Sequence, residues 1–180
     1  PHTVIRLTTN GILLLNQDDE FWRVCRDNNV TIVNTKYPLK LDFEKMKEKA
    51  CSEGVKFEFF EGTGDDIVRK SFKKIINLRG DSNPAESFAT CHISNYGNFL
   101  LDGKFYGCPF SAQSYRIFNN KFGKDLRLTE DDYIDIYKAR SKEEFMEFAA
   151  RPKYYCRYCK GLSPEFPWAR SKGDISEWIE

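Results

Sequence analysis

Residues 30–60, VTIVNTKYPLKLDFEKMKEKACSEGVKFEFF, contain the pattern that determines the predicted fold of the N-terminal third. Val30–Val33 is short and rich in β-branched side chains, which is typical of a buried strand. Residues 42–53 repeat apolar side chains at helical spacing, and Gly54 follows directly, which indicates a helix that ends there. Val55–Phe60 predicts a second strand. The stretch therefore predicts a strand–helix–strand unit.

The same alternation extends toward the N-terminus. Val4–Leu7 predicts a strand and residues 18–28 a helix. Strands that alternate with helices at this spacing form right-handed units with a parallel sheet. Three parallel strands make an incomplete sheet, because parallel sheets are normally covered and extended on both sides. The chain also opens without methionine. We therefore expect a fragment, in which the missing N-terminal half of a barrel or a second copy pairs with Val4–Leu7.

Composition narrows the class of protein. The 180 residues include 28 Lys and Arg against 27 Asp and Glu, so the net charge is +1. A dedicated nucleic-acid binder usually carries a clear basic excess, and nucleic acid is therefore not expected as a partner. The apolar run Ile12–Leu15 is too short for a signal sequence or a membrane span. We expect a cytoplasmic protein without a membrane partner.

The second half has a different pattern. Residues 62–90 read as a polar connector, and its basic stretch 69–74 as a solvated face. Residues 98–101 and 104–108 flank Asp102-Gly103, a strong hairpin signal. A two-residue turn pairs Leu101 with Lys104 and places Cys108 opposite Gly97, which would leave room beside the sulfur. Capping-box patterns at 129–132 and 141–144 predict two helices, and a short helix is expected around Ser176. Residues 86–180 thus form a small α+β domain that follows a domain at 1–85.

The six cysteines divide into two kinds. Cys25 and Cys51 lie in helix-like segments and are expected to be small buried apolar side chains. The other four lie in turn-rich sequence and are the candidate metal ligands: Cys91, Cys108, Cys156 and Cys159.

A Cys-x2-Cys knuckle such as Cys156–Cys159 presents two sulfurs to one centre. Thiolates select zinc or iron–sulfur clusters among the biological metals. Flanking cations would favour the deprotonated sulfurs, and they are Arg151, Lys153, Arg157 and Lys160.

At these residues the chain resembles a known family. Cys91-x11-Gly103-x4-Cys108 is similar to the Cys-x(9–15)-Gly-x4-Cys signature of the SPASM and twitch auxiliary-cluster domains of radical S-adenosylmethionine (SAM) enzymes. The pair Cys156 and Cys159 resembles the remaining ligands of a twitch-type domain, which holds one auxiliary [4Fe-4S] cluster. Relatives often carry a further cysteine where Gly97 stands.

The resemblance implies that residues 1–85 are the C-terminal half of a radical SAM partial barrel plus a connector. Thr9 and Asn10, after the first strand, would then contact the ribose or the methionine moiety of SAM in the full-length parent. The family cleaves SAM at a cluster held by Cys-x3-Cys-x2-Cys, and the 180 residues contain no such triplet. We therefore expect an α/β half barrel followed by a twitch-like domain, with no catalytic residues and no radical-generating activity in this chain alone.

The four cysteines allow three interpretations. Four ligating cysteines leave no open iron, so an auxiliary cluster would transfer electrons or support the structure rather than bind substrate. The same four thiolates would satisfy zinc, in a structural four-cysteine module that mediates protein or nucleic-acid contacts. Disulfide bonds between the cysteines are a third interpretation.

Overall fold

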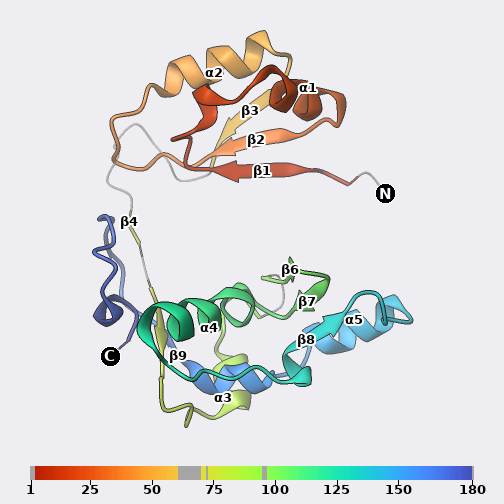
Figure 1. Cartoon of the computed structure of the whole chain (residues 1–180), viewed down its shortest axis with the longest axis vertical. Coiled ribbons are helices and arrows are strands. Elements are labelled where there is room, and N and C mark those ends of the chain that lie inside the picture. Colours follow the sequence, from red (N-terminus) through yellow and green to blue (C-terminus); the bar gives the residue numbers. More distant parts are fainter. Residues whose placement is uncertain (1–2, 61–69, 72, 95–96, 180) are drawn as a thin grey trace. The chain divides into compact units, whose positions relative to one another are not determined.

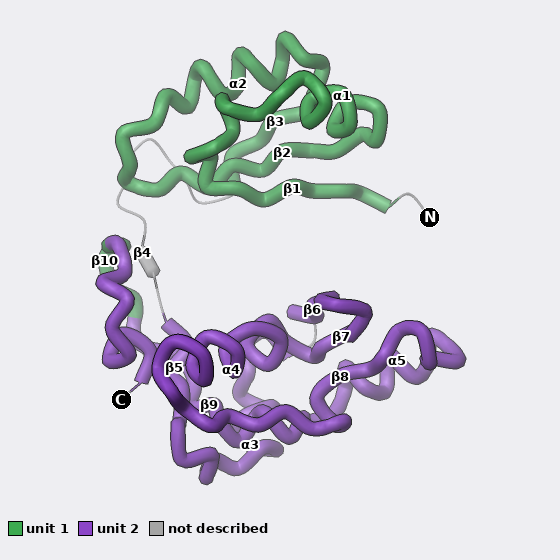
Figure 2. The backbone as a smooth tube through the Cα atoms, viewed as in Figure 1, with its two compact units in different colours: residues 1–71, 165–169 green, residues 72–164, 170–180 purple. Residues whose placement is uncertain are grey.

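The computed structural model of the chain describes residues 3–60, 70–71, 73–94 and 97–179. They form two compact units, the first of residues 1–71 with 165–169 and the second of residues 72–164 with 170–180 (Figure 2). The strand β5 (Lys74–Ile76) precedes the predicted domain boundary at residue 85 and is part of the second unit.

The first unit contains a parallel sheet with the strand order β1 (Arg6–Thr9), β2 (Thr31–Asn34) and β3 (Lys56–Phe59). The helices α1 (Asp19–Asp27) and α2 (Phe43–Ser52) connect these strands. Both lie on the same side of the sheet, as consecutive right-handed crossovers require (Figure 1). The expected parallel sheet is confirmed, and the described strands form no closed barrel.

Two shorter features complete the first unit. The 3-10 helix η1 (Leu14–Asn16) follows β1. The short strands β4 (Lys70–Ser71) and β10 (Phe166–Pro167) pair antiparallel in a sheet of their own.

An aspartate caps the N-terminus of each helix of this unit. The carboxylate of Asp18 accepts from the backbone N–H of Phe21 at 2.8 Å, and that of Asp42 accepts from Lys45 at 2.9 Å. Such a cap satisfies one of the N–H groups that the first helical turn leaves without a partner.

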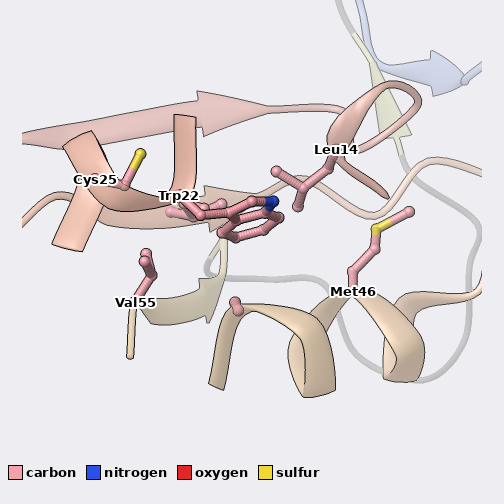
Figure 3. Close-up of a cluster of buried hydrophobic side chains, with 7 residues drawn as sticks. Leu14, Trp22, Cys25, Met46 and Val55 are labelled. Atoms are coloured by element: carbon pink, nitrogen blue, oxygen red, sulfur yellow. The ribbon is translucent and has the colours of Figure 1, made fainter. Parts of the chain in front are cut away.

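Figure 3 shows the core of the first unit, in which the fully buried Trp22 lies among side chains from α1, α2, η1 and the start of β3. Cys25 belongs to this core, as predicted. The prediction for Cys51 is wrong, because this thiol is exposed. Each helical residue advances by about 100°, so Cys51 lies off the face that carries the buried Met46 and Ala50.

The second unit contains two antiparallel sheets. One has the order β6 (Phe99–Leu101), β7 (Lys104–Tyr106) and β8 (Tyr133–Asp135), and the other pairs β5 with β9 (Cys159–Leu162). The predicted hairpin is confirmed, with Leu101 opposite Lys104. The ladder ends at the pair Phe99–Tyr106, so the expected pairing of Gly97 with Cys108 does not form.

Helices surround these sheets: α3 (Pro84–Ala89), α4 (Pro109–Phe122), α5 (Lys142–Ala149) and the 3-10 helices η2 (Glu130–Asp132), η3 (Tyr154–Tyr158) and η4 (Ile175–Glu177). The helix predicted after Thr129 is a single 3-10 turn, because the strand β8 begins at Tyr133. The helix predicted after Ser141 is α5, and that around Ser176 is η4. The core of this unit joins Ile76, Phe118, Leu126, Tyr155 and Tyr158.

Within the described ranges, no helix combines the length and the apolar composition that a membrane crossing requires.

A pair of glycines tests the packing of the first unit. Gly11 and Gly54 both have positive φ, 80° and 71°. A Cβ on Gly11 would lie 2.5 Å from Asn34 Nδ2 and 2.9 Å from Met46 Sδ, whereas one on Gly54 meets only the flexible Arg26 side chain at 3.4 Å. Alanine at either position strains the backbone by about 1–2 kcal/mol, and Gly11→Ala adds about 1–3 kcal/mol of overpacking. Denaturant unfolding should therefore show the larger loss for Gly11→Ala; equal losses would contradict this packing.

The outer edge of β1 gives a second prediction. Thr31 donates its N–H to the Ile5 carbonyl at 3.0 Å, and Thr35 donates to that of Thr9 at 2.9 Å. Since backbone groups alternate along a parallel strand, the N–H of Thr8 points away from β2. In the described sheet β1 pairs only with β2, and such an edge is a template for another strand.

We expect a dimer through this edge in sedimentation experiments. Thr8→Pro removes an outward N–H and should give a monomer, whereas Thr8→Ala keeps the N–H and should leave the dimer intact. A monomeric wild-type protein would contradict the expectation.

Candidate metal centre

Four separate elements position the four candidate ligands. Cys91 follows α3 and donates its N–H to the Phe88 carbonyl at 3.1 Å. Cys108 is the N-cap of α4, Cys156 lies in η3, and Cys159 is the first residue of β9. All six cysteines of the chain are free thiols, so none is joined in a disulfide.

The four cysteines line one cavity in the second unit. The centre of a water molecule can occupy about 30 Å³ of this cavity. The surfaces of the lining atoms lie ~1.4 Å beyond that volume. Aromatic rings and two lysines form much of the remaining wall, namely Phe88, Phe110, Tyr155, Lys74 and Lys153. The cavity is therefore larger than the space that one ion occupies.

Across the described residues, no group of three or more His, Cys, Asp or Glu is arranged to hold a metal ion. A zinc ion with four thiolates at ~2.3 Å requires sulfurs about 3.8 Å apart. The cysteines thus surround the cavity without meeting at one point. A cluster of several irons binds each thiolate at a different iron, so its ligands stand farther apart than those of one ion.

The start of α4 positions Cys108. The Cys108 sulfur accepts from the N–H of Ser111 at 3.4 Å, in the manner of an N-cap side chain. Pro109 follows at the first helical position, where its missing N–H costs nothing. The Cys-Pro-x-Ser sequence therefore fixes both the beginning of the helix and the direction of the sulfur.

A buried carboxylate positions the knuckle. Asp132 is fully buried, and its Oδ1 accepts from the N–H of Tyr155 at 2.6 Å. Its Oδ2 accepts from the N–H and the hydroxyl of Thr129, at 2.8 and 3.2 Å. Burial raises the pKa of Asp132, while the two N–H donors oppose that shift. Because Tyr155 precedes Cys156, the carboxylate holds the element that carries this ligand.

The Tyr155 ring is held at its other end as well. The hydroxyls of Tyr155 and Ser114 are hydrogen-bonded at 2.7 Å across the buried interior. Burial raises the pKa of the Tyr155 hydroxyl far above its usual range. The N–H of Lys153 lies 3.5 Å from the sulfur of Cys156 and donates to it.

The thiols of the knuckle hold their protons at neutral pH. Burial raises the pKa of Cys156, and raises that of Cys159 to about 12. Lys74 opposes the shift at Cys159. A metal that binds here must therefore displace protons, which is the usual coupling of metal affinity to pH.

Two lysines of the cavity wall are nearly buried. Lys74 is 4% exposed, so the prediction that the basic stretch 69–74 is a solvated face is wrong for this residue. Arg69 and Phe72 lie outside the described residues. Lys153 is 5% exposed, and its ammonium donates to the carbonyls of Phe148 and Arg151. Burial, with repulsion from Arg151, lowers the pKa of Lys153 to about 8.

Two glycines near the site have different roles. A Cβ on Gly107 would lie 2.9 Å from Cε of Lys153, so glycine at this position leaves room for the buried lysine. A Cβ on Gly97 would lie 2.9 Å from the Ile93 carbonyl oxygen, and Gly97 does not line the cavity. Gly97 therefore does not leave the room that the sequence predicts beside Cys108, and the space at Gly107 is occupied by Lys153.

Thr9 and Asn10, the predicted SAM contacts, lie in the first unit at the carboxyl end of β1. Their side-chain oxygens accept from the N–H groups of Gly11 and Ile12, each at 3.1 Å, and so form the turn. Asn34 ends β2 beside them and donates to the Thr9 carbonyl at 3.4 Å. Its buried Oδ1 has no hydrogen-bond partner among the described residues.

Sequence reasoning missed Lys74, Asp132 and Asn34. A polar residue at the end of the buried strand 31–34 was the available signal for Asn34. The capping box identified Asp132 as a local cap, but its bond to Tyr155 joins residues 23 positions apart. No local pattern signals the burial of Lys74.

Neighbouring aspartates test the support of the knuckle. In Asp132→Asn the amide can still accept from one N–H, but its NH2 group then faces the donors of Thr129. An unsatisfied buried donor costs about 1–3 kcal/mol. Asp131→Asn changes a 67% exposed side chain that makes one surface ion pair at 3.5 Å, so its effect should stay within ~0.5 kcal/mol. Equal free energies of unfolding for the two variants would contradict the proposed support.

Comparison with known proteins identified no relative of this chain. A scan against models of protein families and a search of curated proteins both found no match to this chain. Any functional conclusion therefore depends on the cysteine motif and on the arrangement of the side chains around the cavity.

Proposed function

We propose that the second unit binds an auxiliary [4Fe-4S] cluster through Cys91, Cys108, Cys156 and Cys159, and that the chain is the C-terminal part of a radical SAM enzyme. The observation that carries the proposal is that these four cysteines, from four elements, line one cavity. The similarity of Cys91-x11-Gly103-x4-Cys108 to the SPASM and twitch signature supports it.

The chemistry of the residues present suits such a cluster. The four thiols line a cavity larger than the space of one ion, which suits several irons better than one zinc ion. The aromatic wall gives the low-polarity surroundings that protect iron–sulfur centres from solvent. The nearly buried Lys74 and Lys153 supply positive charge next to the four sulfurs.

When bound, the cluster would supply one-electron transfer or a covalent link between distant elements. Four thiolates occupy all four irons, and no iron is then left for a substrate. The arrangement therefore favours electron transfer or structural support over the binding of a substrate by the cluster.

The first unit would be the C-terminal half of the radical SAM barrel in this proposal. Its three parallel strands and their order support that role. Thr9 and Asn10 lie at the carboxyl edge of the sheet, where ligands of open α/β sheets usually bind. The 180 residues contain no Cys-x3-Cys-x2-Cys triplet, so the SAM-cleaving cluster would belong to another part of the parent.

Metal analysis of anaerobically purified protein tests the proposal. We expect about four irons and four acid-labile sulfides per chain. Alanine at position 91, 108, 156 or 159 should remove most of the iron, because each thiolate holds a different iron. Cys51→Ala, which changes an exposed thiol of the first unit, should leave the iron content unchanged.

Two results would contradict the proposal. One is a full cluster in Cys108→Ala. The other is a colourless protein that holds one zinc ion and no iron, which would establish the structural zinc module instead.

A further inference from the structure

The cavity contains an imbalance of charge. Lys74 and Lys153 line it at 4% and 5% exposure, and none of its described lining residues is Asp or Glu. Lysine is seldom buried this deeply without a partner, since an uncompensated buried charge is costly. The cavity wall therefore carries two lysines whose positive charge no carboxylate among its described residues balances.

The protein groups that contact the Lys153 ammonium are neutral. It donates to two backbone carbonyls, and it lies 4.2 Å from the centre of the Phe148 ring. The buried carboxylate of Asp132 is used by the N–H groups of Thr129 and Tyr155. With a cluster bound, the anions next to the lysines inside the cavity would be the four cysteine thiolates.

Each lysine acts electrostatically on the cysteines. Lys74 favours the thiolate of Cys159, and Lys153 interacts with Cys156 and Cys108. Gly107 shows that the path of Lys153 is specific, because any side chain there would lie 2.9 Å from its Cε. The two lysines thus come from different elements: Lys74 lies in β5, and Lys153 directly precedes η3.

The charges can be counted. An oxidised [4Fe-4S] core with four thiolates has a net charge of minus two, which two ammonium groups balance. Uptake of one electron from an external reductant lowers the net charge to minus three. Buried positive charges in the wall of the same cavity favour the more negative, reduced form, because solvent screens them little.

We propose that Lys74 and Lys153 raise the reduction potential of the cluster by neutralising its charge inside the cavity. This inference rests on the proposed function, and it specifies how the same site is regulated. Both lysines act through their positive charge and do not ligate iron.

Redox titration of the anaerobic holoprotein tests the inference, with dithionite as the reductant and the EPR signal of the reduced cluster as the readout. Lys74→Met and Lys153→Met keep the length of each side chain and remove its charge. Each should shift the midpoint potential to a more negative value, and the double variant should shift it further.

Lys160→Met is the matched control. It removes the same charge beside Cys159, but from an exposed side chain. Its potential should equal that of the wild type at 0.5 M salt, where a surface charge is screened, whereas the shifts of the buried variants should persist. Iron and sulfide are measured in every variant, so a change in potential is read only from intact clusters.

The outcomes separate the two proposals. Wild-type protein without iron overturns the proposed function and this inference with it. An intact cluster whose potential is unchanged in Lys74→Met overturns the inference alone, even when Lys153→Met does not fold. A negative shift that Lys160→Met reproduces at high salt also overturns it.

Discussion

The second unit depends on the desolvated bond between Asp132 and the backbone of Tyr155, at 2.6 Å. A buried carboxylate is stable only when its oxygens are hydrogen-bonded, and here all of its donors come from η3 and from its own turn. The bond therefore locks the knuckle to the sheet of β6, β7 and β8. The Tyr155 ring then packs in the core with Phe118 and Tyr158. The positions of Cys156 and Cys159 follow from this one contact and its packing.

The local elements could be predicted where the signal lies within a few residues. The strand–helix–strand pattern of 30–60, the Asp102-Gly103 hairpin and the helix after Ser141 are all of this kind. The helix α4 was missed, although Pro109 at its first position and Gly123 in a left-handed conformation after its last residue mark both ends. The burial of Cys51 was predicted wrongly, because neighbouring residues of a helix point about 100° apart and Cys51 follows the buried Ala50.

The candidate site could be predicted only in part. The motif identifies four cysteines, and their relation to one cavity follows from the packing of distant elements. Lys74 illustrates why the rest was out of reach: a lysine in a basic stretch is normally solvated, and only the pairing of β5 with β9 buries it beside Cys159. The position of Gly97 could not be predicted either, because the ladder stops two residues short of the predicted pair of Gly97 with Cys108.

The spread of the ligands along the chain has a consequence for biosynthesis. Cys91 and Cys159 are separated by most of the second unit, and β9, which carries the last ligand, also completes the sheet with β5. During translation the ribosome releases Cys91 and Cys108 well before the final pair. A nascent chain then offers two of the four candidate ligands. The proposed cluster would therefore be complete only after residue 159 has emerged from the ribosome.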